Sequence, residues 1–178
     1  MLYSVGHSKR LLQELLGLLA DHSVASVLDV RCYPFSRRNP QFGRQALSEA
    51  LESSGIRYRH LPKLGGLRSP HKDASPHQGW EGEAFRAFAD YMETAPFSDA
   101  VDELLELTNG SKACMLCAEA DPYRCHRRLI SDYLTAIRQV QVVHILRPEE
   151  SERHRLTPFA TITGQTLLYP KSQAQLFG

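Results

Sequence analysis

The stretch ACMLCAEADPYRCHRRLISDYLTAIR, residues 113–138, decides the fold. Its apolar opening, Ala113 to Cys117, is typical of a strand that is buried on both faces of a parallel sheet. After a polar loop, leucine, isoleucine and tyrosine recur at helical spacing, which predicts a helix over residues 125–138. A buried strand that leads into an amphipathic helix is the building unit of an α/β protein.

The same alternation of strand and helix continues on both sides of this stretch. It predicts a mostly parallel sheet of about five strands flanked by helices on both faces, as in a Rossmann-like α/β fold. The strand that ends in Asp29-Val30-Arg31 also resembles rhodanese-like domains, which implies a rhodanese-like fold as the alternative. Residues 1–146 are expected to form this single domain, with residues 147–178 as an extension that packs on it or trails from it. The expected strands are 2–5, 25–30, 56–60, 113–117 and 142–146, and the expected helices include 9–21, with Ser8 as its N-cap, and 44–54.

Length and composition place the chain among globular proteins. The sequence has 178 residues, 42% of them hydrophobic, and none of its apolar runs is long enough to cross a membrane. We therefore expect a cytoplasmic protein that has no membrane partner. Four cysteines are too few to suggest a disulfide framework in a chain of this size, so we expect free thiols.

The net charge of +1 conceals two oppositely charged halves. Residues 31–77 hold nine Lys and Arg against three Asp and Glu, whereas residues 81–121 hold ten acids against two bases. The basic half could face the phosphates of a nucleotide or nucleic acid, or the two halves could simply neutralise each other or be solvated.

Polar side chains follow three of the expected strands at their carboxyl ends. These are His7 and Ser8, then Asp29 and Arg31, then Cys117 and Glu119. In an open parallel sheet such ends meet at one edge, where ligands bind. We therefore expect a site there, with Asp29, Arg31, Arg37, Arg127 and Ser8 binding substrate or phosphate.

The thiol at the start of the last long helix is the candidate nucleophile. A helix start favours a thiolate at Cys125, and His126, Arg124 and Arg127 add to that effect. The expected catalytic residues are Cys117, Glu119, Cys125, His126 and His7. A small buried structural thiol is the alternative reading of Cys125.

The spacing of the cysteines argues against a metal site. Cys114 and Cys117 have the two-residue gap of many zinc ligands, but residues three apart on a strand point to opposite faces. Cys117, Cys125, His126 and a distant histidine remain a possible set, but no second close ligand pair exists. We therefore expect neither zinc nor any other cofactor.

The C-terminal residues contain a short peptide motif. Gln173, Leu176 and Phe177 resemble the segment by which bacterial repair and replication proteins dock on the DNA sliding clamp. Two adjacent apolar side chains on a tail favour insertion into a partner's pocket. Packing of the tail on its own domain is the alternative.

The ordered motifs of the chain resemble one family as a set, the domain of unknown function family 488. The resemblance spans residue 2 to about residue 146 and implies that the motif residues line a common site. Some members carry a provisional DNA-repair label. Cys32 departs from the pattern, which tends to have Ser there. The motifs are VGHS at 5–8, LDVR at 28–31 with Pro34, Ser36 and Arg37, NPQF at 39–42, LGG at 64–66, Tyr91-Met92, LCAE at 116–119 and CHR at 125–127.

Three functions are compatible with these observations. The first is an enzyme that acts on a phosphate-bearing substrate, such as nucleic acid in DNA repair, through a Cys/Glu/His/Arg site. The second is a non-catalytic module that binds DNA or a nucleotide and docks on the sliding clamp. The third is a thiol or sulfur-transfer enzyme that acts on a small molecule.

Overall fold

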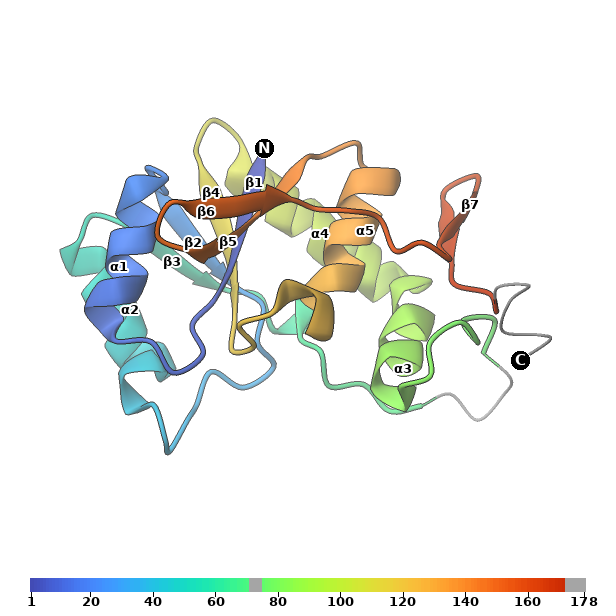
Figure 1. The fold of residues 1–178 in the computed structure, drawn as a ribbon, viewed down its shortest axis with the longest axis horizontal. Coiled ribbons are helices and arrows are strands. Elements are labelled where there is room, and N and C mark those ends of the chain that lie inside the picture. The colour runs from blue at the N-terminus through green and yellow to red at the C-terminus, as the bar shows by residue number, and fades with distance from the viewer. Residues whose placement is uncertain (71–74, 172–178) are drawn as a thin grey trace.

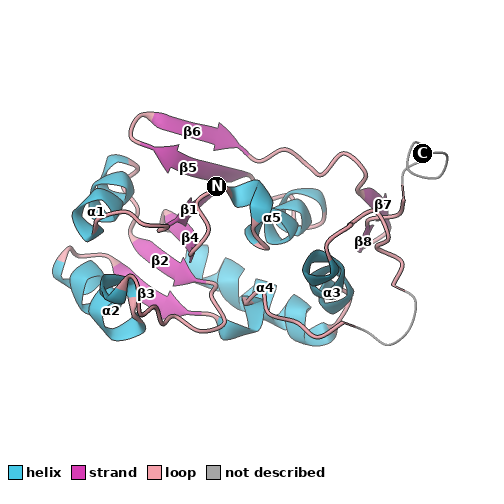
Figure 2. Cartoon of the chain, turned by 60° about the horizontal axis from the view of Figure 1, so that its bottom comes forward, coloured by secondary structure: helices cyan, strands magenta, loops and turns pink. Residues whose placement is uncertain are grey.

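A six-stranded sheet forms the centre of the molecule in the computed structural model, which describes residues 1–70 and 75–171 (Figures 1 and 2). The strands lie in the order β3-β2-β4-β1-β5-β6. The first five run parallel, and β6 runs antiparallel to β5, so the prediction of a mostly parallel α/β sheet is confirmed. Their bounds are β1 Leu2–Gly6, β2 Ser26–Asp29, β3 Arg57–His60, β4 Ala113–Cys117, β5 Val142–Arg147 and β6 Glu150–Arg153.

Five α-helices cover the two faces of the sheet (Figure 2). Side chains that alternate along β4 separate the faces: Cys114 packs into one apolar cluster, and Met115 into the other. Helices α1 (Leu12–Asp21) and α2 (Arg44–Ser53) complete the first cluster. Helices α3 (Glu83–Met92), α4 (Ala95–Thr108) and α5 (Arg127–Ala136) complete the second.

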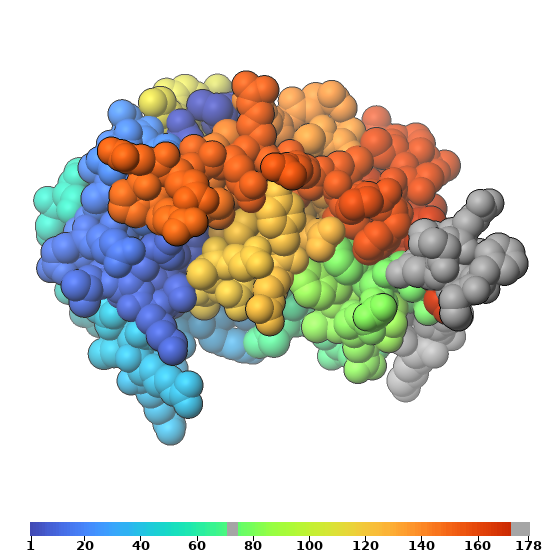
Figure 3. Space-filling model, in the orientation of Figure 1, coloured from blue at the N-terminus to red at the C-terminus, as the bar shows by residue number. Residues whose placement is uncertain are grey.

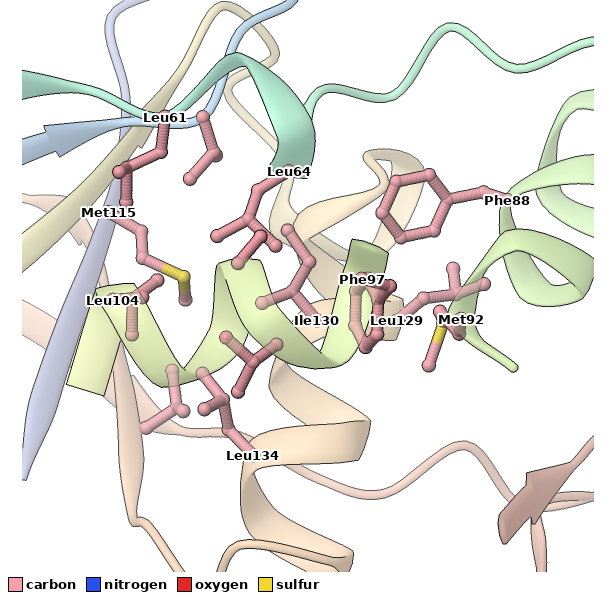
Figure 4. Packing of buried hydrophobic residues seen from close by; sticks show 14 of the residues in the cluster. Leu61, Leu64, Phe88, Met92, Phe97, Leu104, Met115, Leu129, Ile130 and Leu134 are labelled. Atoms are coloured by element: carbon pink, nitrogen blue, oxygen red, sulfur yellow. The ribbon is translucent and has the colours of Figure 1, made fainter. Parts of the chain in front are cut away.

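The larger core lies between the sheet and the three helices α3, α4 and α5 (Figure 4). Met115 of the sheet, Leu104 of α4 and Ile130 of α5 point into it together with Leu64 of a short 3-10 helix at Pro62–Leu64. Burial of such side chains contributes roughly 1.5–3 kcal/mol each. This packing fixes α5 and the preceding residues relative to the end of β4.

The N-cap prediction for Ser8 is wrong. Helix α1 begins at Leu12, and the residue at its N-cap is Leu11, which makes no side-chain capping bond. The chain after β1 instead follows the chain after β4, because the amide of His7 donates to the carbonyl of Cys117 at 2.9 Å and that of Ser8 to Ala118 at 2.8 Å. Ser8 adopts a positive φ of 47° there.

Helix α5 also begins later than predicted. Its first residue is Arg127, and Cys125 is extended, with φ −127° and ψ 150°. Proline at the first position of the preceding 3-10 helix, Pro122–Arg124, starts a separate turn, which Asp121 caps by accepting from the Tyr123 amide. Cys125 therefore lies just before the helix, not within its first turn.

The described part of the C-terminal extension lies against α5. The buried Asp132 carboxylate accepts hydrogen bonds from His154 Nε2 at 2.8 Å, from the Thr157 hydroxyl at 2.7 Å and from the Tyr169 hydroxyl at 3.0 Å. The extension also supplies β6 and a hairpin of β7 (Thr161–Thr163) and β8 (Thr166–Leu168). A buried carboxylate with this many donors is a strong anchor.

None of the helices in the described residues is long and apolar enough to cross a lipid bilayer.

Candidate active site

The carboxyl ends of three adjacent central strands, β2, β4 and β1, meet at one edge of the sheet. A cleft of about 600 Å³ lies there. It has the polar residues of the strand ends at its base and an apolar wall that includes Leu67, Phe85 and Phe88. Of the site residues predicted from sequence, the cleft is lined by Ser8, Arg31, Cys117, Glu119, Cys125 and His126.

Two thiols and an imidazole converge at the base of this cleft. Cys117 and Cys125 are 7% and 5% exposed, respectively, and both line it. Nδ1 of His126 lies 3.6 Å from Sγ of Cys125 and 4.0 Å from Sγ of Cys117. The two sulfurs and Nδ1 all lie within 4.8 Å of one another. A loop of seven residues thus brings the two thiols to one point, as the sequence predicted.

The ring of His126 is fixed by its surroundings. Its Nε2 lies 3.0 Å from the carbonyl oxygen of Val30 and donates to it, so Nδ1 faces the thiols. Phe88 packs beside the ring, with centroids 5.3 Å apart. Gly66 approaches the ring so closely that a Cβ atom there would lie 2.6 Å from Nδ1. The sequence motif LGG therefore leaves space for this ring.

Arg127 is a buried cation whose partners are a thiol, a hydroxyl and a carbonyl. It is 1% exposed. Its Nε lies 3.4 Å from Sγ of Cys125 and its Nη1 lies 3.0 Å from Oγ of Ser4, while Nη2 donates to the carbonyl of Glu119. In the described part of the chain no carboxylate forms an ion pair with Arg127. A buried charge requires a counter-charge, and the sulfur of Cys125 is positioned to supply it.

These contacts shift the pKa values of the two thiols in opposite directions. A hydrogen bond from Cys117, together with His126 and Arg127, holds the pKa of Cys125 well below its usual range despite burial. The same hydrogen bond to Cys125, and burial, raise the pKa of Cys117 well above its usual range. The site therefore holds one thiolate, Cys125, beside one protonated thiol, Cys117.

Asp29, Arg31 and His7 form a separate buried network behind the cleft. Nε of Arg31 donates to Asp29 Oδ1 at 2.8 Å, and Nη2 donates to Oδ2 at 2.5 Å. Nη1 donates to the carbonyl of Phe42 at 2.8 Å and to Nε2 of His7 at 3.2 Å. Tyr58 donates to the same carboxylate at 2.7 Å. Most donors of Arg31 are therefore held by the protein itself, although the residue lines the cleft.

His7 is a neutral acceptor in this network. It is buried, stacked on Phe42 with ring centroids 4.3 Å apart, and burial lowers its pKa to about 4. Its Nδ1 donates to the carbonyl of Ser8 at 3.0 Å, which leaves Nε2 free to accept from Arg31. His7 is not among the residues that line the cleft, so its contact with Arg31 makes it a positioning residue.

Several predicted residues lie apart from the thiols. Arg37 is exposed on the loop between β2 and α2 and does not line the cleft, and Glu119 is exposed at the rim. Arg124, which the sequence placed beside Cys125, is exposed and lines the rim. Cys114 is buried in the core on the opposite face of the sheet from Cys117, as the strand period predicts. The predicted clamp motif, Gln173, Leu176 and Phe177, falls outside the described residues.

Sequence reasoning missed the residues that hold His126 in place. Val30 acts through its backbone carbonyl, which no side-chain pattern can indicate. The pair Gly65-Gly66 carries a signal, because two adjacent glycines in a loop often mark a close approach of the backbone to another group. The sequence pattern around Phe88 predicts only an ordinary core residue of a helix.

The comparisons with known proteins identify a family and nothing beyond it. Residues 11–134 match the family model described as Domain of unknown function DUF488. No curated protein and no solved structure matches the chain. The matched span includes the Asp29–Arg31 pair and the Cys117–Arg127 segment, and it confirms the resemblance seen in the sequence motifs.

Proposed function

This chain belongs to the family Domain of unknown function DUF488, and we propose that it is a thiol enzyme in which the Cys125 thiolate is the nucleophile. One observation carries the proposal. The Cys125 sulfur lies at the base of the cleft between the buried cation of Arg127, the Nδ1 of His126 and the thiol of Cys117. Cationic and hydrogen-bonding neighbours of this kind are what convert an inert buried thiol into a reactive thiolate.

The cleft favours a small and partly apolar substrate. Its volume of about 600 Å³ lies within the usual range for small-molecule sites. Phe85, Phe88 and Leu67 supply apolar contact, and the rim offers the guanidinium of Arg124 to an anionic group. Arg31 and Arg127, which the sequence suggested as phosphate ligands, are engaged with acceptors of the protein.

The pair of thiols supports thiol–disulfide chemistry on such a molecule. The Cys125 thiolate attacks one sulfur of a small disulfide, a new S–S bond forms, and the other sulfur leaves as a thiolate that takes up a proton. Cys117 then gives its proton to Nδ1 of His126 and attacks the Cys125 sulfur, which expels the second half of the substrate. The expelled thiolate takes the proton from His126, so the substrate gains two electrons and two protons. Two equivalents of a low-molecular-weight thiol then reduce the Cys117–Cys125 disulfide and leave as their own disulfide.

The rate of alkylation as a function of pH tests this proposal. Iodoacetamide is added to the reduced protein in the presence of a chelator, and each modified cysteine is identified by mass spectrometry. We expect Cys125 to react with a midpoint well below the ordinary thiol pKa of about 8.5. The low midpoint should persist in Cys32→Ser and vanish in Cys125→Ser. An ordinary midpoint at Cys125 in folded protein would contradict the proposal.

A second candidate is an enzyme or binding module for nucleic acid, which includes the DNA-repair and clamp-docking readings of the sequence. The loop between β2 and α2 projects from the body of the molecule (light blue in Figure 3). Tyr33 and Phe35 on this loop are 77% and 74% exposed, and Arg37 and Arg38 beside them are also exposed. Exposed aromatic rings among cations are suited to stacked bases and phosphates. The affinity for single-stranded DNA at several salt concentrations tests this candidate.

A further inference from the structure

We propose that Cys117, Cys125 and His126 form a binding site for a thiophilic divalent cation, with Zn²⁺ as the reference ion and one coordination position open to the cleft. The sequence led us to expect no metal site, because the close pair Cys114 and Cys117 points to opposite faces of the sheet. The three donors belong instead to the set that the sequence left possible, and the fold brings them together without a second close ligand pair. The metal site goes beyond the proposed function. Binding of the ion requires two thiolate sulfurs and an imidazole lone pair, but no nucleophilic reaction at Cys125.

The spacing of the three donor atoms fits a tetrahedral ion. Zinc bonds of about 2.3 Å to sulfur and about 2.05 Å to nitrogen, at tetrahedral angles, place S and N about 3.6 Å apart. The observed separations from His126 Nδ1 are 3.6 Å to Cys125 and 4.0 Å to Cys117. The same bonds place the two sulfurs about 3.8 Å apart, and the sulfurs of Cys117 and Cys125 lie within 4.8 Å of each other, so small side-chain movements bring all three donors to one ion. In the described part of the chain no other His, Cys, Asp or Glu side chains form such a group of three.

The surroundings of the ligands are those of a metal site. A metal-binding histidine typically donates its other ring N–H to a backbone carbonyl, and His126 Nε2 does so to Val30 at 3.0 Å. The backbone of Gly66 lies close against the same ring. Nε of Arg127 donates to the Cys125 sulfur at 3.4 Å, which orients the second ligand. These outer contacts fix both donors before an ion enters.

Charge and access are also compatible with an ion. Binding replaces two protons by one divalent cation, so the net charge at the base of the cleft, Arg127 included, does not change. The Cys117 proton, and the proton shared between Cys125 and His126, are released to solvent. Because all three residues line the cleft, the fourth ligand is water or a substrate atom, as in zinc sites with three protein ligands.

Metal titration of the reduced full-length protein tests the site. Zn²⁺ is titrated in competition with a chromophoric chelator, and Co²⁺ is added separately as a spectroscopic probe. We expect one ion per chain, with visible bands of tetrahedral Co²⁺ and thiolate-to-cobalt charge transfer in the near ultraviolet. Cys117→Ser and Cys125→Ser should each weaken binding about 100-fold or more, which exceeds the usual loss of an outer-shell partner. Cys32→Ser, in the same cleft, should bind as wild type does.

A second measurement decides the question if a serine variant does not fold. Zn²⁺ should protect Cys117 and Cys125 of the wild-type protein from alkylation and leave Cys32 unprotected. Absence of stoichiometric binding by folded protein, or binding that survives Cys125→Ser, would overturn the proposal. The two proposals remain separable: a low-pKa thiolate that binds no ion supports only the thiol enzyme, and an ordinary thiol that binds Zn²⁺ supports only the metal site.

Discussion

The Nε2 atom of His126 lies 3.0 Å from the carbonyl oxygen of Val30, and this contact directs the opposite ring nitrogen toward Cys125. The partners are 96 residues apart in the chain. Val30 follows β2, and His126 precedes α5, so the sheet order that places β2 beside β4 creates the contact. The orientation of the imidazole is therefore a consequence of the fold and not of the local sequence.

Gly66→Ala should disable the site with little change in the global fold. The added methyl group would lie 2.6 Å from His126 Nδ1, so the ring must move away from the thiols. We expect the alkylation midpoint of Cys125 to rise toward its ordinary value, and the reaction at pH 6 to slow by about tenfold for each unit by which the new pKa exceeds 6.

Gly17→Ala is the matched control for this substitution. A Cβ atom at Gly17, in the exposed middle of α1, meets no atom within 4 Å. Alanine there should stabilise the helix by about 0.5–1 kcal/mol and leave thiol reactivity unchanged. Equal reactivity in the two variants would show that His126 does not need its present position.

Arg127→Leu should raise the pKa of Cys125, because the buried cation that stabilises the thiolate is removed. The substitution also leaves the Ser4 hydroxyl and the Glu119 carbonyl without their donor, at a cost of about 1–3 kcal/mol each. Arg127→Lys, which keeps the charge but not the planar group, should retain part of the pKa shift. The pH dependence of alkylation, measured on each variant in its folded state, checks both expectations. A midpoint in the leucine variant equal to that of wild type would exclude Arg127 as the counter-charge.

The sequence predicted the fold and part of the site for separable physical reasons. Buried parallel strands such as β4 are short continuous apolar runs, so their positions could be read directly. The ends of α1 and α5 were misplaced because tertiary contacts decide them: Ser8 pairs with the chain after β4, and Cys125 stays extended after the turn at Pro122–Arg124.

Within the site, too, the sequence indicates some features and tertiary contacts decide the others. The sequence indicated Cys117, Cys125 and His126 because thiols and imidazoles are common catalytic groups. The engagement of Arg31 by Asp29 and His7 was not foreseen in full, because a sequence does not show which donors of a guanidinium are already used. Only the fold distinguishes an arginine that is free to bind an anionic ligand from one that is already paired with a carboxylate of the protein.

Stability at low pH should depend on His7. Burial lowers its pKa to about 4 from an unfolded value near 6.5, so the folded state disfavours protonation. The neutral ring contributes its full stability above pH 6.5. That contribution is lost as pH falls from 6.5 to 4, at up to about 1.4 kcal/mol per pH unit. His7→Gln, whose amide oxygen can still accept from Arg31, should lose less stability than wild type over this range in urea denaturation. Parallel curves for the two proteins would contradict the assignment.

Tyr169→Phe should loosen the attachment of the C-terminal extension. The substitution removes a donor at 3.0 Å from the buried Asp132 carboxylate. We expect a loss of about 1–3 kcal/mol in the free energy of unfolding, because the carboxylate keeps only its bonds to His154 and Thr157. Tyr33→Phe, at an exposed position, is the control and should change stability by less than about 0.5 kcal/mol. A similar small effect at both tyrosines would mean that the hydroxyl of Tyr169 does not anchor the extension.

Replacement of Tyr33 and Phe35 by alanine separates the two candidate functions. If single-stranded nucleic acid binds the projecting loop, this double variant should lose about 1–3 kcal/mol of binding free energy per stacked base. Its salt dependence should stay that of wild type, because Arg37 and Arg38 still meet the phosphates. Ile162→Ala removes an exposed apolar side chain from β7 and should have no effect. Reactivity of Cys125 should be unchanged in both variants, because Tyr33 lines the cleft but neither variant removes a partner of the Cys125 sulfur. Wild-type protein that binds no DNA at low salt while Cys125 remains reactive would leave the small-molecule thiol enzyme as the function that the cleft supports.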